Sequence, residues 1–250
     1  FLGELNAILE SEPPMSAGCF NYESDEKEIS FWPRLISALN RLRIDSAQNA
    51  KEELRSSLEV SATEQHRKWV LKAMFLAKFW SDAMRLAEEI LARDPKCYST
   101  KITLARTTRI MGDFEQSIRH WQELISAIPD EFEFYGELGN TQFSAKRFDD
   151  AIASYHFVLR HNPDDIAAHL SIYAAYRELN LADNAEAALQ KAISIPGISD
   201  ETYEQIVKGF LTNEPPEKTL QIIERWLESS PGNPAATHHR NSCLAALKKS

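Results

Sequence analysis

Histidine, serine, cysteine and paired acidic residues are all present, but none stands at the spacing of a known catalytic or metal-binding motif. His156 and His161 are five residues apart, so their side chains would diverge on a helix and could not share a metal ion. The pairs Asp149-Asp150 and Asp164-Asp165 fall at expected turns and helix starts, where carboxylates accept capping hydrogen bonds. General acid–base catalysis instead needs a sequestered pair with separated pKa values. The sequence therefore predicts that this segment is not an enzyme and holds neither a metal ion nor a cofactor.

The composition is acidic and weighs against a nucleic-acid ligand. The formal net charge is −9 at pH 7, whereas phosphate backbones bind to clustered positive surfaces. Cys19, Cys97 and Cys243 lie far apart without a CxxC pair, so neither a disulfide framework nor a zinc site is expected. No apolar run reaches the roughly 18 residues that a membrane span requires. We expect a cytoplasmic protein with no nucleic-acid partner and no membrane span. Because the first residue is not Met, we also expect the chain to be a fragment or a processed product.

The elements that would position any site are predicted by a regular proline spacing. Pro95, Pro129 and Pro163 lie 34 residues apart, and Pro231 lies two further steps along. At the intervening step the chain reads Pro196-Gly197, another helix stop. A period of 34 residues is typical of a helix–turn–helix repeat. Glycine is scarce, with 8 residues in the chain, which also favours helices.

This period divides the chain into blocks 64–97, 98–131, 132–165, 166–199 and 200–233. Small residues would let the two helices of a block approach, aromatic residues would fill the space between them, and a proline would end the second helix. Block 132–165 shows this pattern most clearly, with Tyr135, Leu138, Gly139, Phe148, Ala151, Tyr155 and Pro163. In this pattern the chain resembles the tetratricopeptide repeat family. The resemblance implies an all-α, right-handed superhelical solenoid of antiparallel helix pairs.

The remaining segments are expected to flank the five repeats. Residues 30–63 read as a degenerate helix pair, and residues 1–29 as an N-terminal helix followed by a linker. Residues 234–250 read as a helix with a cationic end that caps the solenoid.

The solenoid is expected to bind a protein or peptide in a concave groove lined by the first helix of each pair. The exposed groove positions would pass from basic to acidic along the chain, which would suit a peptide of opposite polarity. They are Lys68, Lys72, Arg106, Arg109, Glu133, Glu137, Asn140 and Arg177. Tetratricopeptide domains that clamp chaperone tails use Lys, Asn and Arg at fixed positions, but Thr103, Glu133 and Glu137 stand there instead. The resemblance therefore argues against that ligand.

Two other functions remain open. The run from Trp226 to Leu247 resembles the junction at which bacterial tetratricopeptide arrays lead into a methyltransferase or another transferase, such as a glycosyltransferase. The chain would then be the recognition or oligomerisation module of a larger enzyme. End-to-end packing of two solenoids, which is self-association, is the other alternative.

Overall fold

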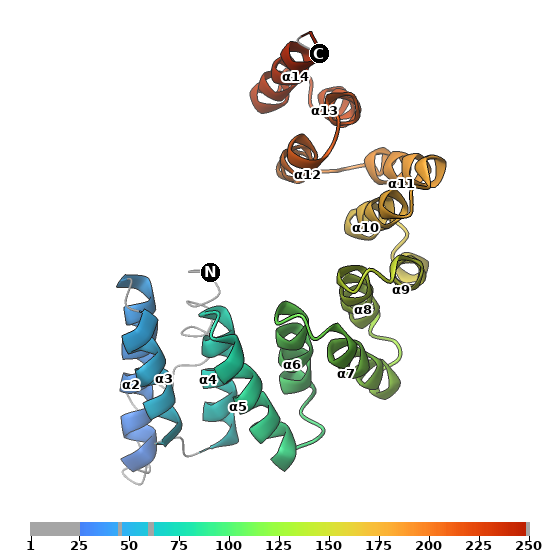
Figure 1. Cartoon of the computed structure of the whole chain (residues 1–250). Coiled ribbons are helices and arrows are strands. Elements are labelled where there is room, and N and C mark those ends of the chain that lie inside the picture. The colour runs from blue at the N-terminus through green and yellow to red at the C-terminus, as the bar shows by residue number, and fades with distance from the viewer. Residues whose placement is uncertain (1–25, 45–46, 60–62, 249–250) are drawn as a thin grey trace. The chain divides into compact units, whose positions relative to one another are not determined.

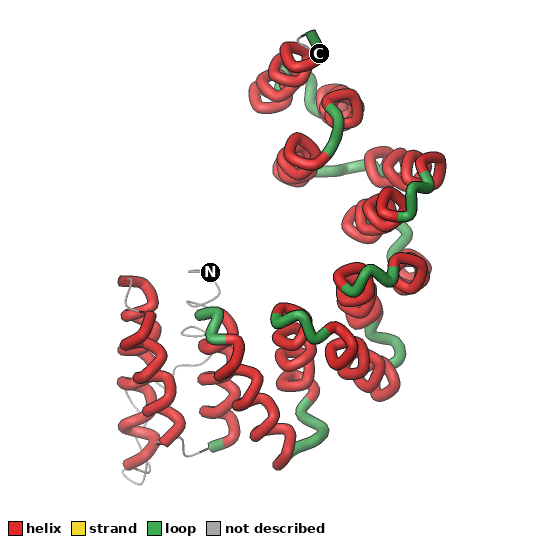
Figure 2. The backbone as a smooth tube through the Cα atoms, in the orientation of Figure 1, coloured by secondary structure: helices red, strands yellow, loops and turns green. Residues whose placement is uncertain are grey.

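The computed structural model describes residues 26–44, 47–59 and 63–248, and every regular element within these ranges is an α-helix. Successive helices are joined by short turns (Figure 1; Figure 2). The expected all-α fold of helix pairs is confirmed. The helices are α2 (Glu26–Ile44), α3 (Ala47–Glu59), α4 (Glu64–Leu76), α5 (Trp80–Arg93), α6 (Tyr98–Ile110), α7 (Phe114–Ala127), α8 (Phe132–Ser144), α9 (Phe148–His161), α10 (Ile166–Glu178), α11 (Ala182–Ser194), α12 (Asp200–Asn213), α13 (Pro216–Ser229) and α14 (Pro234–Leu247).

The chain divides into two compact units, unit 1 (Phe1–Arg147) and unit 2 (Phe148–Ser250). The sequence does not reveal this division, which falls inside block 132–165. In unit 1, α2 packs on α3, α4 on α5 and α6, and α7 on both α6 and α8. In unit 2, α10 packs on α9 and α11, and α13 packs on α12 and α14. Most contacts in each unit are therefore made between helices adjacent in sequence, as in a repeat array.

The turn inside the helix pair repeats its backbone geometry in four successive blocks, whereas Glu214 at the same position of block 200–233 has a φ of −126°. At the fifteenth position of four successive blocks the chain adopts a left-handed conformation, with φ of 62° at Lys78, 86° at Gly112, 61° at Lys146 and 59° at Asn180. Glycine adopts this region freely and asparagine with little strain, whereas lysine pays a steric cost. The repeat therefore imposes the turn even where the local residue does not favour it.

Helix ends follow the signals in the sequence. The predicted capping carboxylate of Asp165 accepts the backbone N–H of Ala168 at 2.8 Å. The prolines at 95, 129 and 163 stand just beyond the last residues of α5, α7 and α9. These positions place each proline where its missing N–H breaks no helical hydrogen bond. Helix ends are thus set by residues that the proline spacing identifies.

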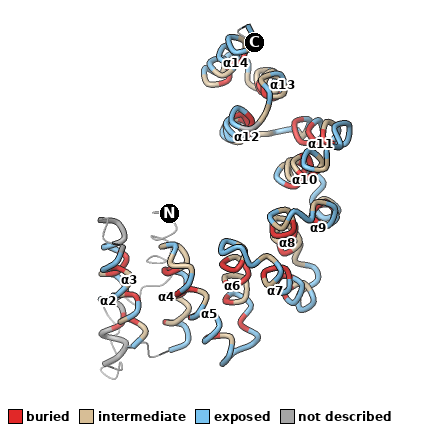
Figure 3. Tube along the Cα trace, viewed as in Figure 1, coloured by how far each residue is buried: buried red, intermediate tan, exposed pale blue. Residues whose placement is uncertain are grey.

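Buried residues recur along the helices of both units (Figure 3). In unit 1 the fully buried Trp121 of α7 contacts Phe134 of α8, with ring centroids 6.0 Å apart. In unit 2, Tyr203 of α12 stacks on Trp226 of α13 at 5.9 Å, and Trp226 donates a hydrogen bond to Asp200 at 2.6 Å. Aromatic residues at helix–helix contacts therefore belong to the core, as the sequence predicts.

Parts of the expected organisation lie outside the described residues, namely the helix and most of the linker predicted within 1–29. Helix α2 begins at Glu26, ahead of the expected pair at 30–63, and contains Pro33. At the other end, Asn233 caps α14 by accepting the backbone N–H groups of Ala235 and Ala236. Helix α14 thus begins directly after this cap, at Pro234.

Candidate functional site

The first helices of successive pairs in unit 1 are α2, α4, α6 and α8, and the last three carry every predicted groove residue except Arg177. A cleft of about 600 Å³ lies between α4 and α6, and we call it the α4–α6 cleft. It brings Lys68, Lys72 and Arg106 around one space, and none of its lining residues is acidic. The lining residues are Gln65, Lys68, Trp69, Leu71, Lys72, Phe75, Leu76, Ser99, Thr100, Ile102, Thr103 and Arg106.

Helix α4 turns one polar stripe toward this cleft and buries the opposite side. Lys68 and Lys72 are four residues apart, so they lie one above the other on the same helical face. Val70, Ala73 and Met74 occupy the core side and are at most 1% exposed. Thr63 caps the start of this helix, because its hydroxyl accepts the backbone N–H of His66 at 3.2 Å. A capped, packed helix thus fixes the positions from which the two lysines extend.

Apolar side chains form a second part of the cleft surface, beside the uncharged polar residues Gln65, Ser99, Thr100 and Thr103. Leu71 is buried, whereas Trp69, Phe75 and Ile102 are half-buried and line the space from both helices. Phe75 is held by an edge contact with Trp80 of α5, with ring centroids 5.3 Å apart. The cleft therefore combines cationic side chains with a preformed apolar surface, a combination typical of peptide-binding sites.

The groove arginines of α6 are already paired with an acidic residue of α8. The Nε of Arg106 donates to Oε1 of Glu137 at 2.8 Å, and Nη2 of Arg109 lies 3.4 Å from Oε2 of the same carboxylate. Glu133 is exposed and Asn140 is half-buried on the same helix. One carboxylate thus bridges two guanidinium groups, which neutralises much of the charge at the middle of the predicted groove.

The two lysines of α4 have different surroundings. Lys72 is exposed and makes no ion pair with any residue that the structure describes. Lys68 is half-buried. Burial opposes ionisation of the nearby Cys97 thiol, but hydrogen bonds with Thr100 and Ser99 outweigh it and lower the pKa of Cys97. Lys72 is therefore the cation of this cleft most open to a partner.

In unit 2 the corresponding first helices are α10 and α12. Side chains of these two helices contact one another on the face that corresponds to the α4–α6 cleft. Tyr173 of α10 stacks on Phe210 of α12 with ring centroids 5.4 Å apart. Arg177, the predicted groove residue of this unit, forms an ion pair with Glu214 at the end of α12 and lies over the Tyr173 ring. Burial raises the pKa of Tyr173, which remains neutral in this cluster. Arg177 is therefore engaged within its own unit.

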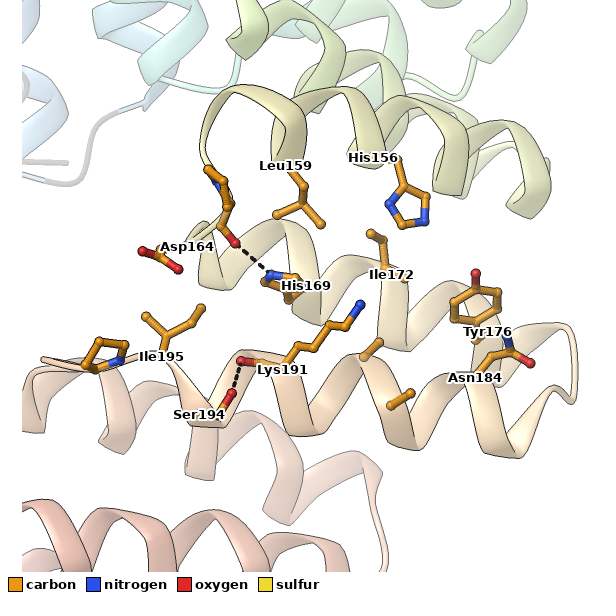
Figure 4. A pocket seen from close by; sticks show the side chains of 14 residues that line it. His156, Leu159, Asp164, His169, Ile172, Tyr176, Asn184, Lys191, Ser194 and Ile195 are labelled. Atoms are coloured by element: carbon orange, nitrogen blue, oxygen red, sulfur yellow. Dashed lines mark hydrogen bonds between the residues drawn. The ribbon is translucent and has the colours of Figure 1, made fainter.

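Unit 2 has a different cleft of about 570 Å³, formed by α9, α10 and α11 (Figure 4). His169 contacts the backbone oxygen of Pro163 through Nε2 at 2.9 Å, while His156 and Lys191 extend into the opening. Burial lowers the pKa of His156, and the nearby Lys191, His169 and Arg160 lower it further. Because Asp164 also lines this cleft, its charges are mixed, and it selects neither anions nor cations as clearly as the α4–α6 cleft.

Sequence reasoning missed the apolar half of the α4–α6 cleft. Trp69 stands at the sixth position of its block, the position held by Thr103 and Glu137 in the next two blocks. Phe75 stands one helical turn beyond Lys72. These positions within the repeat could have indicated that Trp69 and Phe75 line the groove. An aromatic residue on a helix is, however, usually attributed to the core.

Within the described residues, no group of three or more His, Cys, Asp or Glu side chains is arranged to hold a metal ion.

None of the helices that the structure describes is long and apolar enough to cross a lipid bilayer.

Comparisons with known proteins identify the repeat. The tetratricopeptide repeat family matches residues 102–155 and 137–200. A thermophilic tetratricopeptide protein from Thermus thermophilus is 20% identical with a TM-score of 0.51, covering 73% of this chain and 100% of its own. MamA from Desulfovibrio magneticus is 12% identical with a TM-score of 0.59, covering 71% of this chain and 98% of its own. No curated protein matches the chain. At these identities the structural likeness concerns the fold.

Proposed function

We propose that this chain, in which residues 102–200 match the tetratricopeptide repeat family, is a scaffold that binds a protein or peptide partner through the α4–α6 cleft. The fold supports a protein-interaction role, because its packed helices hold side chains at fixed spacing and so lose little freedom on binding. The observation that carries the proposal is the lining of the cleft, which presents Lys68, Lys72 and Arg106 beside apolar surface without a carboxylate. Groups of this kind suit a partner that brings both charge and an apolar side chain.

The test reverses the charge of the two α4 lysines. The double variant Lys68→Glu/Lys72→Glu should keep its helical content by circular dichroism, because glutamate is also a good helix former. It should weaken capture of cellular partners by about tenfold or more, because it replaces attraction by repulsion at the cleft. Arg106 and Arg109 are left in place, since reversing them would set acidic groups against Glu137.

The matched control is Lys96→Glu/Arg119→Glu, which makes the same change in net charge at two exposed positions outside the cleft lining. Partners should be recovered with the control variant as with the unmodified protein. If both double variants lose the same partners equally, overall charge rather than the cleft governs capture and the proposal is wrong. Recovery of the same partners at the same affinity with the cleft variant also contradicts it.

A further inference from the structure

We propose that the partner segment in the α4–α6 cleft is an extended peptide with the pattern acidic–any–acidic–any–aromatic, read along α4. This inference rests on the proposed function and specifies its ligand. It follows from three properties of the cleft: the sign of its charge, the spacing of its cations and the place of its apolar surface.

The sign of the charge selects an acidic ligand. The whole chain carries a formal net charge of −9, yet three cations and no acidic residue line this cleft. Positive charge concentrated in a partly apolar concavity attracts anions more strongly than the same charge spread over the surface. A basic peptide would meet these cations with no compensating carboxylate in the lining.

The spacing of the lysines selects the backbone conformation. A four-residue step on an α-helix rises about 6 Å. In an extended chain, side chains on the same side recur every second residue, about 6.6–6.8 Å apart. A peptide that lies extended along α4 can therefore direct the carboxylates of alternate residues toward Lys68 and Lys72. Adjacent acidic residues would point to opposite sides, and only one could reach a lysine of this pair.

The apolar surface sets the third position. Phe75 and Leu76 follow Lys72 by three and four residues, which is one further helical turn, and Ile102 lines the cleft from α6. The next alternate residue of the peptide would lie against this surface. An aromatic side chain fills such a half-buried concavity with little loss of conformational freedom.

The cations of the cleft should contribute unequally to peptide binding, because they differ in how far they are already engaged. Arg106 shares its charge with Glu137 and Lys68 is half-buried, whereas Lys72 is exposed and pairs with none of the described residues. A ligand carboxylate at Lys72 therefore displaces no internal ion pair. Removal of the Lys72 charge should weaken binding more than removal of the Arg106 charge.

The probe is the labelled peptide Phe-Ser-Glu-Ser-Glu-Ser-Phe, measured by fluorescence anisotropy with the whole chain. Its palindromic pattern offers the required order in both directions of binding. Replacing both glutamates by glutamine should weaken binding by about tenfold. The peptide Phe-Ser-Glu-Glu-Ser-Ser-Phe has the same composition but adjacent acids, and we expect it to bind about threefold to tenfold more weakly.

Variants of the protein test the residues. Lys72→Gln should lower the affinity for the probe by about fivefold. Lys96→Gln, outside the cleft, should leave this affinity unchanged. Higher salt should weaken binding to the unmodified protein more than binding to Lys72→Gln. Equal affinity for the alternating and adjacent-acid peptides would overturn the extended pattern. A third peptide carries lysine in place of both glutamates, and tighter binding of this peptide than of the probe would overturn the acidic-peptide assignment. Displacement of the probe by a single-stranded oligonucleotide at similar concentrations would also overturn it.

These outcomes separate the two proposals. If Lys68→Glu/Lys72→Glu loses its cellular partners while the probe does not bind, the cleft binds a partner of another pattern and only this inference is wrong. If the probe binds and Lys72→Gln weakens it, while both double variants keep their partners, the peptide chemistry holds and the use of the cleft for cellular partners is wrong.

Discussion

The first-helix faces of the two units are built from the same repeat and differ in what fills them. In unit 1 the α4–α6 cleft holds about 600 Å³ of open space beside Lys68 and Lys72. In unit 2 the face between α10 and α12 is filled by the stacked rings of Tyr173 and Phe210. The eighth position of the block explains part of the difference, because it is Leu71 in α4 and Tyr173 in α10. A repeat therefore specifies where helices lie, while single side chains decide whether a face stays open.

The largest expected effect tests whether the two units unfold independently. Trp226 is 1% exposed, stacks on Tyr203 and is the only tryptophan in unit 2 by sequence. Trp226→Ala should cost about 3–5 kcal/mol, because it leaves a large cavity in the core of unit 2. The four remaining tryptophans, Trp32, Trp69, Trp80 and Trp121, belong to unit 1. Unfolding of Trp226→Ala followed by circular dichroism should therefore begin at a lower urea concentration. The urea midpoint followed by tryptophan fluorescence should stay unchanged.

The reciprocal variant is Trp121→Ala in the core of unit 1, which should move the fluorescence midpoint to lower urea. If Trp226→Ala instead moves the fluorescence and circular dichroism midpoints together, the units unfold as one cooperative body. Units 1 and 2 would then be two parts of a single folding unit rather than two independent ones.

The second prediction concerns the contact that fills the unit 2 face. A double-mutant cycle with Tyr173→Leu and Phe210→Leu should show a coupling of about 0.5–1.5 kcal/mol in unfolding free energy, as expected for a stacked aromatic pair. The control cycle pairs Tyr173→Leu with Cys243→Ala in α14, a helix that packs on α13 and α12, and its coupling should be near zero. Coupling of equal size in both cycles would mean that the effect spreads through the unit rather than arising from the ring contact.

The sequence predicts the helix ends better than the surface of the groove. A proline lacks the N–H that continues a helix, so Pro95, Pro129 and Pro163 mark helix ends whatever surrounds them. The pairing of Arg106 with Glu137 joins residues 31 positions apart. It depends on side-chain conformations that the repeat pattern does not contain. The positions of the groove residues could thus be predicted, but not which of their charges remain available.

The third prediction compares the turns of the two units. Lys78 in unit 1 and Asn180 in unit 2 both have φ in the left-handed region, at 62° and 59°. Lys78→Gly should stabilise the chain by about 0.5–1 kcal/mol, because it removes the steric cost of a left-handed lysine. Asn180→Gly should gain less, since asparagine tolerates this conformation. Both are measured by urea unfolding.

The matched control for the turns is Gly112→Ala, at the equivalent position where φ is 86° and no atom lies within 4 Å of an added Cβ. Because no clash is introduced, its expected destabilisation of about 1 kcal/mol reports the backbone alone. If Lys78→Gly and Asn180→Gly stabilise equally, the lysine carries no extra strain and the turns of the two units are equivalent.

The smallest expected effect is a loss of folding stability at acid pH that arises from His120 in unit 1 and is absent at neutral pH. Neither ring nitrogen of His120 in α7 has a hydrogen-bond partner among the described residues, and burial lowers the pKa of this histidine below its ordinary 6.5. The nearby Glu123 and Asp113 oppose this shift, while Lys101 and Arg119 add to it. A histidine with a lowered folded pKa binds fewer protons in the folded than in the unfolded chain, so its stability is full above about pH 6.5 and declines as the pH falls below that value.

The variant that tests this is His120→Leu, which removes the titrating ring while keeping an apolar side chain of similar size. Unfolding free energies measured from about pH 7.5 to about pH 5 should fall less steeply for His120→Leu than for the unmodified chain. His238→Leu is the control, because His238 is exposed and its removal should leave the slope unchanged. A slope that is the same for all three proteins would place the acid sensitivity elsewhere. A slope flattened by His120→Leu in the tryptophan signal, which reports mainly unit 1, would locate it beside Trp121 in the core of that unit.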